Sequence, residues 1–135
     1  MIKLTTDEIK YISMFENMTK ATVKDCIING NNITFLIKEG EMGLAIGKKG
    51  VNIKTAQKFF GKKINIFEYS NNMEQFIRNI FSPARVNKID QDGDSVKIFL
   101  DPQSKRKLRN IIRNRIPILR QLLERHFKTK KVLVV

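Results

Sequence analysis

Cysteine, histidine and long apolar runs are scarce in this 135-residue chain, and these shortages exclude whole classes of protein. The single cysteine, Cys26, cannot form an intramolecular disulfide and supplies no metal cluster, which excludes a disulfide scaffold and a structural zinc module. No apolar run approaches the roughly 18–20 residues of a membrane span, and the first residues lack the apolar stretch of a signal peptide. We therefore expect a soluble cytoplasmic protein that needs no metal or other cofactor and no membrane.

Acidic residues are also scarce, at 13 against 26 lysines and arginines, which gives a net charge of +13. Arginine is missing from residues 1–70, and Glu124 is the one acidic residue between positions 102 and 131. A basic surface attracts polyanions, and clustering of the basic residues indicates a nucleic-acid-binding face. A solvated lysine-rich surface is one alternative. An anionic membrane surface is a weaker one, because the basic segment has few large apolar residues to enter a bilayer.

The first predicted element is a helix over residues 6–18. Thr5, followed three positions later by Glu8, is typical of a capping box, which satisfies backbone N–H groups at a helix start. Ile9, Ile12 and Phe15 then recur at helical spacing. We expect all three to face a core.

Alternating apolar residues and turn signals predict the other elements of the first half. Residues 29–32 form a turn rich in Asn and Gly, and Gly61 is a plausible C-cap. We predict strands over residues 21–28, 33–38 and 63–68, a short helix over 42–46, a tight loop over 47–50 and a helix from there to about residue 60.

The second half repeats this succession of elements. Ser82-Pro83 ends a helix, Asp92-Gly93 is a hairpin signal, and we expect Pro117 to mark a helix start because proline is tolerated in a first turn. The predicted elements cover residues 73–81, 84–89, 95–100, 103–112, 117–127 and 131–135. The order α-β-β-α-α-β thus occurs twice. We predict an α/β protein of the α+β type with two domains, 1–70 and 71–135, each with helices packed on a three-stranded sheet.

Gly47-Lys48-Lys49-Gly50 lies between two predicted helices. Glycine accepts positive φ and leaves room for a phosphodiester, and the N–H groups and dipole of the following helix start favour phosphate. The two lysines add positive charge. A Gly-x-x-Gly sequence alone is more often a structural turn than a binding site. Inside an α-β-β-α-GxxG-α-β succession, we interpret it as a nucleic-acid contact.

The segment from Gly43 to Lys54, Gly-Leu-Ala-Ile-Gly-Lys-Lys-Gly-Val-Asn-Ile-Lys, resembles the core of a KH domain in its type II arrangement. The order of elements over nearly the whole chain resembles the archaeal NusA-like transcription factors. In that family the sequence Phe-Ser-Pro-Ala-Arg-Val, here at residues 81–86, leads into the second unit. The resemblance implies two tandem type II KH domains.

The resemblance also implies binding of single-stranded RNA, in which the GxxG loop clamps the backbone of about four nucleotides beside an apolar groove. It implies a factor that acts in transcription elongation, termination or antitermination, with RNA polymerase or nascent-transcript complexes, and we expect the chain to be a monomer. For Ile46 and Ile53 the alternative is core packing, which is the preferred interpretation of Ile53. The implied RNA-binding residues are Ile46, Gly47, Lys48, Lys49, Gly50, Asn52 and Lys54.

The second unit departs from the family pattern, because no glycine follows Gly93. The family pattern would place a GxxG loop near residues 110–113, where isoleucine cannot cheaply adopt a left-handed conformation, so we expect this unit to have a degenerate loop that does not hold phosphate in the standard way. The second unit could bind RNA electrostatically, hold a partner or brace the first unit, and we favour an auxiliary electrostatic contact. The residues of this auxiliary surface are Lys105, Arg106, Lys107, Arg109, Arg113 and Arg115.

Other motifs carry less weight. The spacing from Gly43 to Lys49 does not fit a P-loop, and the aspartates from 90 to 101 indicate a hairpin turn rather than a calcium loop. Cys26 is interpreted as a small buried residue and His126 as a residue at a helix end. No catalytic constellation is present, so we expect no enzyme. The alternative function is a basic interaction module that docks on polymerase or ribosomal components with little RNA affinity of its own.

Overall fold

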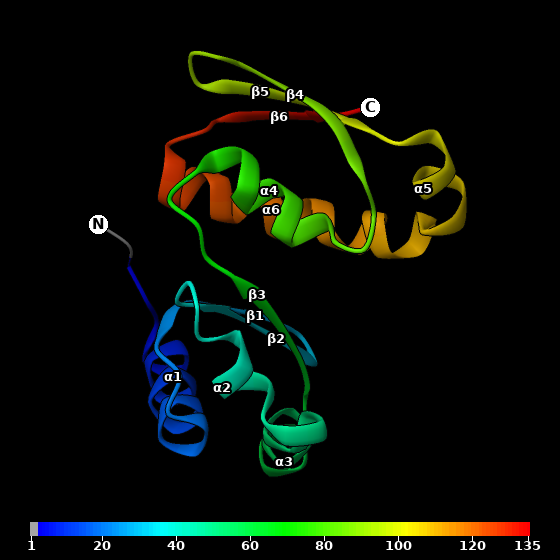
Figure 1. Ribbon diagram of the computed structural model, residues 1–135. Helices are drawn as coiled ribbons and strands as arrows, with labels where there is room; N and C mark the ends of the chain where they lie inside the picture. The colour runs from blue at the N-terminus through cyan, green and yellow to red at the C-terminus, as the bar shows by residue number, and fades with distance from the viewer. Residues whose placement is uncertain (1–2) are drawn as a thin grey trace. The chain divides into compact units, whose positions relative to one another are not determined.

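The computed structural model describes residues 3–135, which fall into two units, one ending at Ser70 and one spanning Asn71–Val135 (Figure 1). The elements of the first unit are α1 (Thr6–Thr19), β1 (Val23–Asn29), β2 (Asn32–Ile37), α2 (Met42–Ile46), the 3-10 turn η1 (Lys48–Gly50), α3 (Val51–Phe60) and β3 (Lys63–Glu68). Those of the second unit are α4 (Met73–Phe81), β4 (Val86–Asp92), β5 (Ser95–Leu100), α5 (Pro102–Lys107), α6 (Arg109–Phe127) and β6 (Lys131–Val134). The predicted α+β class and order of elements are confirmed.

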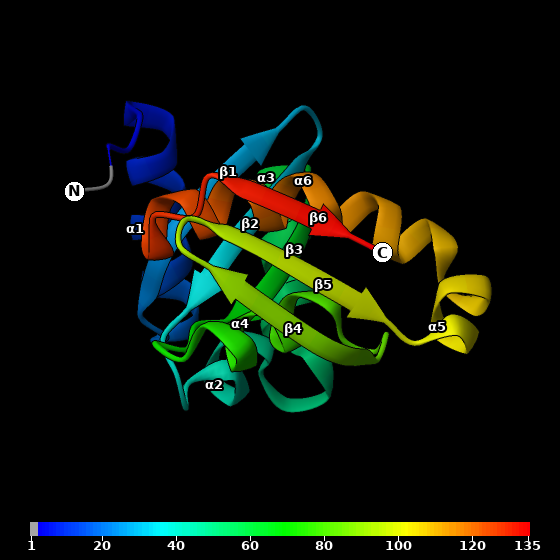
Figure 2. The same cartoon turned by 90° about the horizontal axis from the view of Figure 1, so that it is seen from above.

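Each unit has a three-stranded sheet with the same topology. The strand orders are β1-β2-β3 and β4-β5-β6, with an antiparallel first pair and a parallel second pair. Figure 2 shows the sequence of strands β4, β5 and β6 across the second sheet. A parallel pair needs a crossover connection, which α2 and α3 provide in the first unit and α5 and α6 in the second. The helices of each unit lie on one face of its sheet (Figure 1).

The capping box at the start of α1 is confirmed. Thr5 Oγ1 accepts the N–H of Glu8 at 3.1 Å, and Glu8 Oε1 accepts the N–H of Thr5 at 2.8 Å. Phe15 is fully buried and stacks on Phe35 of β2 with a centroid distance of 4.4 Å. The expectation for Ile9 is wrong, since its side chain is 54% exposed. Six helical steps place Ile9 about 120° around the helix from Phe15, away from the core face.

Several strands differ from their predicted bounds by one to three residues, and the largest difference is the end of β4, at Asp92 rather than at residue 89. β1 begins at Val23 rather than at residue 21, and β4 begins at Val86 rather than at residue 84. In the β4–β5 hairpin, Asp92 pairs with Ser95, so the two-residue loop consists of Gly93 and Asp94. Gly93 has a φ of 60°, which explains the need for glycine at this position.

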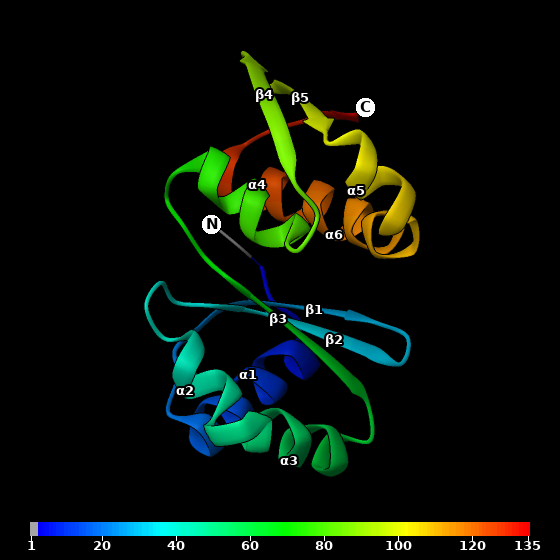
Figure 3. The same cartoon turned by 45° about the vertical axis from the view of Figure 1, so that its right-hand side comes forward.

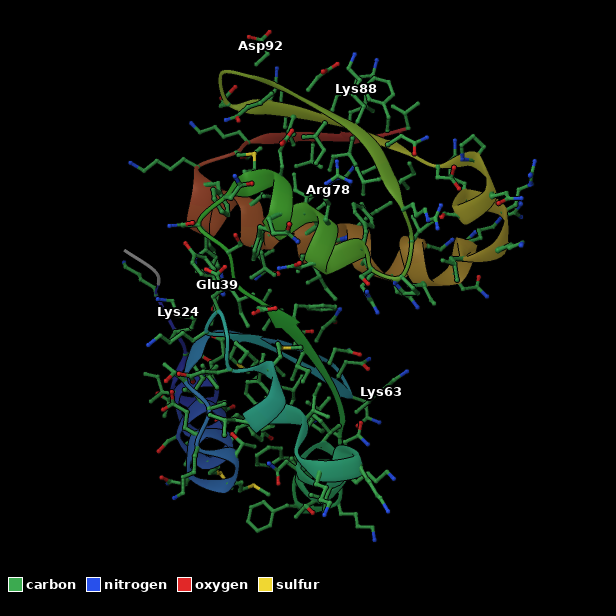
Figure 4. All side chains as sticks on the ribbon, viewed as in Figure 1. Lys24, Glu39, Lys63, Arg78, Lys88 and Asp92 are labelled. Atoms are coloured by element: carbon green, nitrogen blue, oxygen red, sulfur yellow. The ribbon has the colours of Figure 1, made fainter. Side chains whose placement is uncertain are left out.

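Buried apolar side chains of α4 and α6 form the interior of the second unit. Phe76 and Ile80 of α4 are fully buried, and so are Leu119 and Leu123 of α6. Arg78 of α4, which Figure 4 labels, donates a hydrogen bond to the carbonyl of Val86 on β4. The second sheet and its helices are therefore joined by polar as well as apolar contacts.

Helix α6 contradicts two predictions. It runs from Arg109 to Phe127 with Pro117 in its interior, so Pro117 does not mark a helix start. The predicted helix over residues 103–112 is divided between α5 and α6 at Leu108. An interior proline removes an N–H donor and costs about 3 kcal/mol or more. Buried residues before and after the proline, Ile112 and Leu119, anchor both parts of α6 and outweigh that cost.

Replacing Pro117 by Ala should raise the free energy of unfolding by about 1–3 kcal/mol, because alanine restores the missing N–H donor inside α6. Urea denaturation followed by circular dichroism measures the change. The matched control is Pro102→Ala, because Pro102 occupies the first turn of α5, where proline is favourable. A loss of stability in both variants would show that a helix begins at residue 117.

Candidate nucleic-acid interface

Gly47, Lys48, Lys49 and Gly50 form a tight turn between α2 and α3, which we call the GxxG turn. Three of its residues have positive φ, namely Gly47 at 76°, Lys49 at 55° and Gly50 at 74°. The N–H of Gly47 bonds to the carbonyl of Gly43 at 2.9 Å, and the N–H of Gly50 bonds to that of Gly47 at 3.1 Å. The predicted tight loop is confirmed as a compact hydrogen-bonded turn.

The two glycines of the turn are needed for different reasons. Gly47 combines its positive φ with a ψ of 171°, a region that only glycine adopts readily. A Cβ at Gly47 would also lie 2.6 Å from the Cγ atom of Asn52. Gly50 is left-handed as well, but a Cβ there would meet nothing within 4 Å. The close approach at Gly47 therefore makes it the more stringent of the two positions.

Asn52 connects the two helices that flank the GxxG turn. Its Nδ2 atom donates to the carbonyl of Leu44 at 2.7 Å, which joins the first turn of α3 to the middle of α2. The resemblance implies a direct RNA contact for Asn52, and that contact stays a prediction, because the bond to Leu44 uses only one of the two N–H groups of the amide. In the structure Asn52 is a residue that holds the turn in shape. The sequence carries one signal for this role, a short polar residue two positions after the second glycine.

The start of α3 favours an anionic ligand. Its N-cap residue, Gly50, makes no side-chain capping bond, and its first turn contains no acidic residue. Lys48, Lys49 and Lys54 are exposed, and within residues 3–135 none of them forms an ion pair. The N–H of Val51 bonds to the carbonyl of Lys48, whereas no side chain caps the N–H groups that follow it, and the helix start presents its positive dipole end. Positive charge and hydrogen-bond donors thus meet on the exposed side of the turn.

Exposed aliphatic side chains flank the GxxG turn on both sides. Ile46 is 39% exposed, Leu44 48% and Val51 50%. Ile53, by contrast, is partly buried and packs against the core of the first unit, as its preferred interpretation predicts. Leu44 and Val51 are site candidates that the sequence analysis missed. Their positions near the turn were the available signal, since Leu44 lies in α2 three positions before Gly47 and Val51 begins α3.

The second unit has no counterpart of the GxxG turn. The expected absence of a standard loop agrees with the connection between α5 and α6, but the position near residues 110–113 is wrong, because these residues lie inside α6. The α5–α6 junction is the single residue Leu108, whose N–H bonds to Ser104 and whose carbonyl accepts from Ile112. Figure 3 shows α5 running into α6 through this short connection. The crossover lacks glycine because a one-residue bend at a φ of −118° needs none.

A pocket of about 660 Å³ lies beside this junction, between α5, the first turns of α6 and the end of β6. Four of its lining residues are basic, and no acidic residue lines it. The basic residues are Lys105, Arg106, Arg109 and Arg113, and the apolar ones are Leu100, Pro102, Ile112, Ile116, Val134 and Val135. Four members of the predicted auxiliary surface are therefore brought together around one pocket.

The other two members of the auxiliary surface lie elsewhere. Arg115 donates from Nη1 to the carbonyls of Ile80 at 2.6 Å and Ser82 at 3.0 Å, so it joins α6 to the end of α4. Burial lowers the pKa of the Arg115 guanidinium from its usual value. Lys107 is exposed at the end of α5 and does not line the pocket. Arg115 thus has a structural role that residue type alone did not reveal.

Cys26 and His126, to which the sequence analysis gave no functional role, lie where they were predicted. Cys26 is buried, with 1% of its surface exposed, and His126 is in the last turn of α6. Within residues 3–135, no group of three or more His, Cys, Asp or Glu side chains could hold a metal ion. No helix in that part of the chain is long and apolar enough to cross a membrane.

A helix–turn–helix crossover with a glycine-bounded basic turn on an α-β-β-α-α-β scaffold is the arrangement that defines a KH domain. The KH domain family matches residues 9–119, and the chain belongs to that family. Its fold is similar to the crystal structure of APE1850, with a TM-score of 0.80 and 28% sequence identity. This similarity covers 98% of the present chain and all of that one.

The chain is also homologous to archaeal proteins named probable transcription termination protein NusA. It is 37% identical to the one from Methanocaldococcus jannaschii, over 99% of this chain and 75% of that protein. It is 49% identical to the one from Methanococcus vannielii, over 65% of this chain and 51% of that protein. The match thus spans three quarters of one relative and half of the other.

Gly47→Ala should lower the free energy of unfolding by about 1–3 kcal/mol, since it adds backbone strain and pushes Asn52 off the Leu44 carbonyl. Gly50→Ala, which meets no neighbouring atom, should cost about 1 kcal/mol from its left-handed φ alone. Thermal and urea denaturation measure both variants. An equal loss of unfolding free energy in both variants would contradict the role of Asn52. Adding Asn52→Ala to Gly47→Ala should recover part of the stability that Gly47→Ala loses.

Proposed function

We propose that the chain is a single-stranded RNA-binding transcription factor built of two tandem type II KH units, residues 1–70 and 71–135. The observation that carries this proposal is the GxxG turn, in which two exposed lysines stand at an uncapped helix start. The matching strand order of the two sheets supports the two-unit assignment. The second unit lacks the glycine turn, so it is a degenerate member of the pair.

RNA binding in this proposal uses both sides of the turn. Backbone N–H groups at the start of α3 donate to phosphate oxygens, while Lys48, Lys49 and Lys54 neutralise the phosphate charge. The glycines let the phosphodiester approach the backbone closely. Ile46 and its exposed neighbours Leu44 and Val51 contact the faces of unpaired bases. Single strands are favoured over a duplex because these apolar contacts need splayed bases.

The transcriptional part of the proposal rests on the relatives. Their printed name, probable transcription termination protein NusA, supports a factor that acts on nascent RNA with RNA polymerase in elongation, termination or antitermination. The alternative is a docking module with little RNA affinity of its own. Its support is the basic pocket in the second unit, for which the RNA-binding proposal expects no more than an auxiliary electrostatic contact.

Lys48→Asp combined with Lys49→Asp should remove most binding to a short single-stranded RNA, because both changes place negative charge beside the phosphate path. Aspartate tolerates the left-handed φ of residue 49. Removing two phosphate contacts should also reduce the salt slope of the binding constant by about 1.4. A fluorescence anisotropy titration at several salt concentrations measures both quantities, with double-stranded DNA as a second ligand.

The matched control is Lys10→Glu combined with Lys58→Glu, which makes the same change in net charge at exposed positions outside the turn. Circular dichroism checks that both variants are folded. If the control loses as much RNA affinity as the turn variant, binding is unspecific and the GxxG turn is only a structural element. If native protein binds no RNA, the docking module becomes the function.

A further inference from the structure

The pocket of the second unit combines cationic and aliphatic side chains along one face of α6. Arg109, Ile112, Arg113 and Ile116 all line it, at the spacing of residues that share one side of a helix. Arg109 and Arg113 lie about 6 Å apart along the axis, as one helical turn requires. A ligand that fits this face must carry negative charges beside an apolar group.

The positive charge around the pocket has no partner in the described part of the chain. Lys105, Arg106, Arg109 and Arg113 are exposed and form no ion pair within residues 3–135. The neighbouring acidic residue, Asp101, accepts the N–H of Ser104 as the N-cap of α5 and does not line the pocket. Like charges held together repel one another, and an anionic ligand relieves that repulsion.

Its chemistry favours a carboxylate ligand over an RNA backbone. No glycine turn brings a phosphodiester close to the protein backbone, since Leu108 forms the junction. No aromatic side chain lines the pocket to stack on a base. Guanidinium groups bind carboxylates as well as phosphates with two parallel hydrogen bonds, and the aliphatic floor, which accepts an apolar side chain rather than a base, favours an acidic peptide.

We propose that this pocket docks an acidic segment of a partner protein. Carboxylates of that segment pair with Arg109 and Arg113, and a large apolar side chain enters the pocket over Ile112 and Ile116. A volume of about 660 Å³ is ample for one such side chain together with its neighbours. This docking site is separate from the RNA site of the GxxG turn and would exist whether or not that turn binds RNA.

The test uses the full chain and two fluorescent synthetic peptides, one of repeated Asp-Glu-Leu units and one of repeated Asp-Glu-Ser units. The leucine peptide should bind, and the serine peptide of equal charge should bind on the order of tenfold more weakly, because it loses the apolar anchor. Arg109→Glu combined with Arg113→Glu should lower the affinity for the leucine peptide on the order of tenfold or more. Both arginines are exposed, so these changes spare the core.

The matched control is Lys128→Glu combined with Lys130→Glu, two exposed residues past the other end of α6, about 27 Å along its axis from Arg109. It should retain most peptide binding. Equal binding of both peptides, an equal loss in the control, or no peptide binding would overturn the proposal.

Parallel titrations with single-stranded RNA separate this proposal from the RNA-binding one. The variant with Arg109→Glu and Arg113→Glu should bind RNA with the same affinity as the control with Lys128→Glu and Lys130→Glu. If the arginine variant selectively loses RNA and the native protein ignores the peptides, the pocket is a nucleic-acid site and the docking proposal fails. An unchanged RNA affinity in the Lys48 and Lys49 variant would instead count against the GxxG turn alone.

Discussion

The parallel pairing of the third strand with the second determines the arrangement of each unit. Strand β3 runs alongside β2, and β6 alongside β5, so the chain must return across the sheet before the third strand starts. Two successive helices make that return in both units and lie on one face of the sheet (Figure 1). Strand pairing fixes the position of these two helices but does not fix the conformation of the connection between them.

The two units differ in this connection. In the first unit the link is a four-residue turn with three positive φ angles, and Asn52 holds it by bonding to Leu44. In the second unit the link is Leu108 alone, and the room beside it is a pocket with a basic rim. The first arrangement suits a phosphate that approaches the backbone. The second suits an anionic group that is recognised through side chains.

Some basic residues of the second unit join secondary-structure elements, and others form an exposed charged surface. Their positions in the sequence do not show which residue does which. Arg78 and Arg115 donate to backbone carbonyls and join secondary-structure elements within the unit. Arg109 and Arg113 stand one turn apart on the exposed side of α6. A count of charges between residues 102 and 131 treats Arg113 and Arg115 alike, although burial of Arg115 makes it part of the scaffold.

The sequence by itself determined the features that depend on local chemistry. The capping box at Thr5, the turn at Gly47 and the order of elements follow from residue types at short spacing, because caps, positive φ and apolar alternation act over a few residues. Strand β3 and helix α4 have their predicted bounds for the same reason.

Tertiary packing decided the rest. Pro117 remains inside α6 because buried residues on both sides outweigh a local penalty, and Ile9 is exposed because only one side of α1 meets the sheet. Asn52 and Arg115 bond to partners eight or more positions away in the chain, and the basic residues of α5 and α6 line a pocket only because Val134 and Val135 pack beside them. Such partners are fixed only when the strands pair and the helices pack, which local residue patterns do not encode.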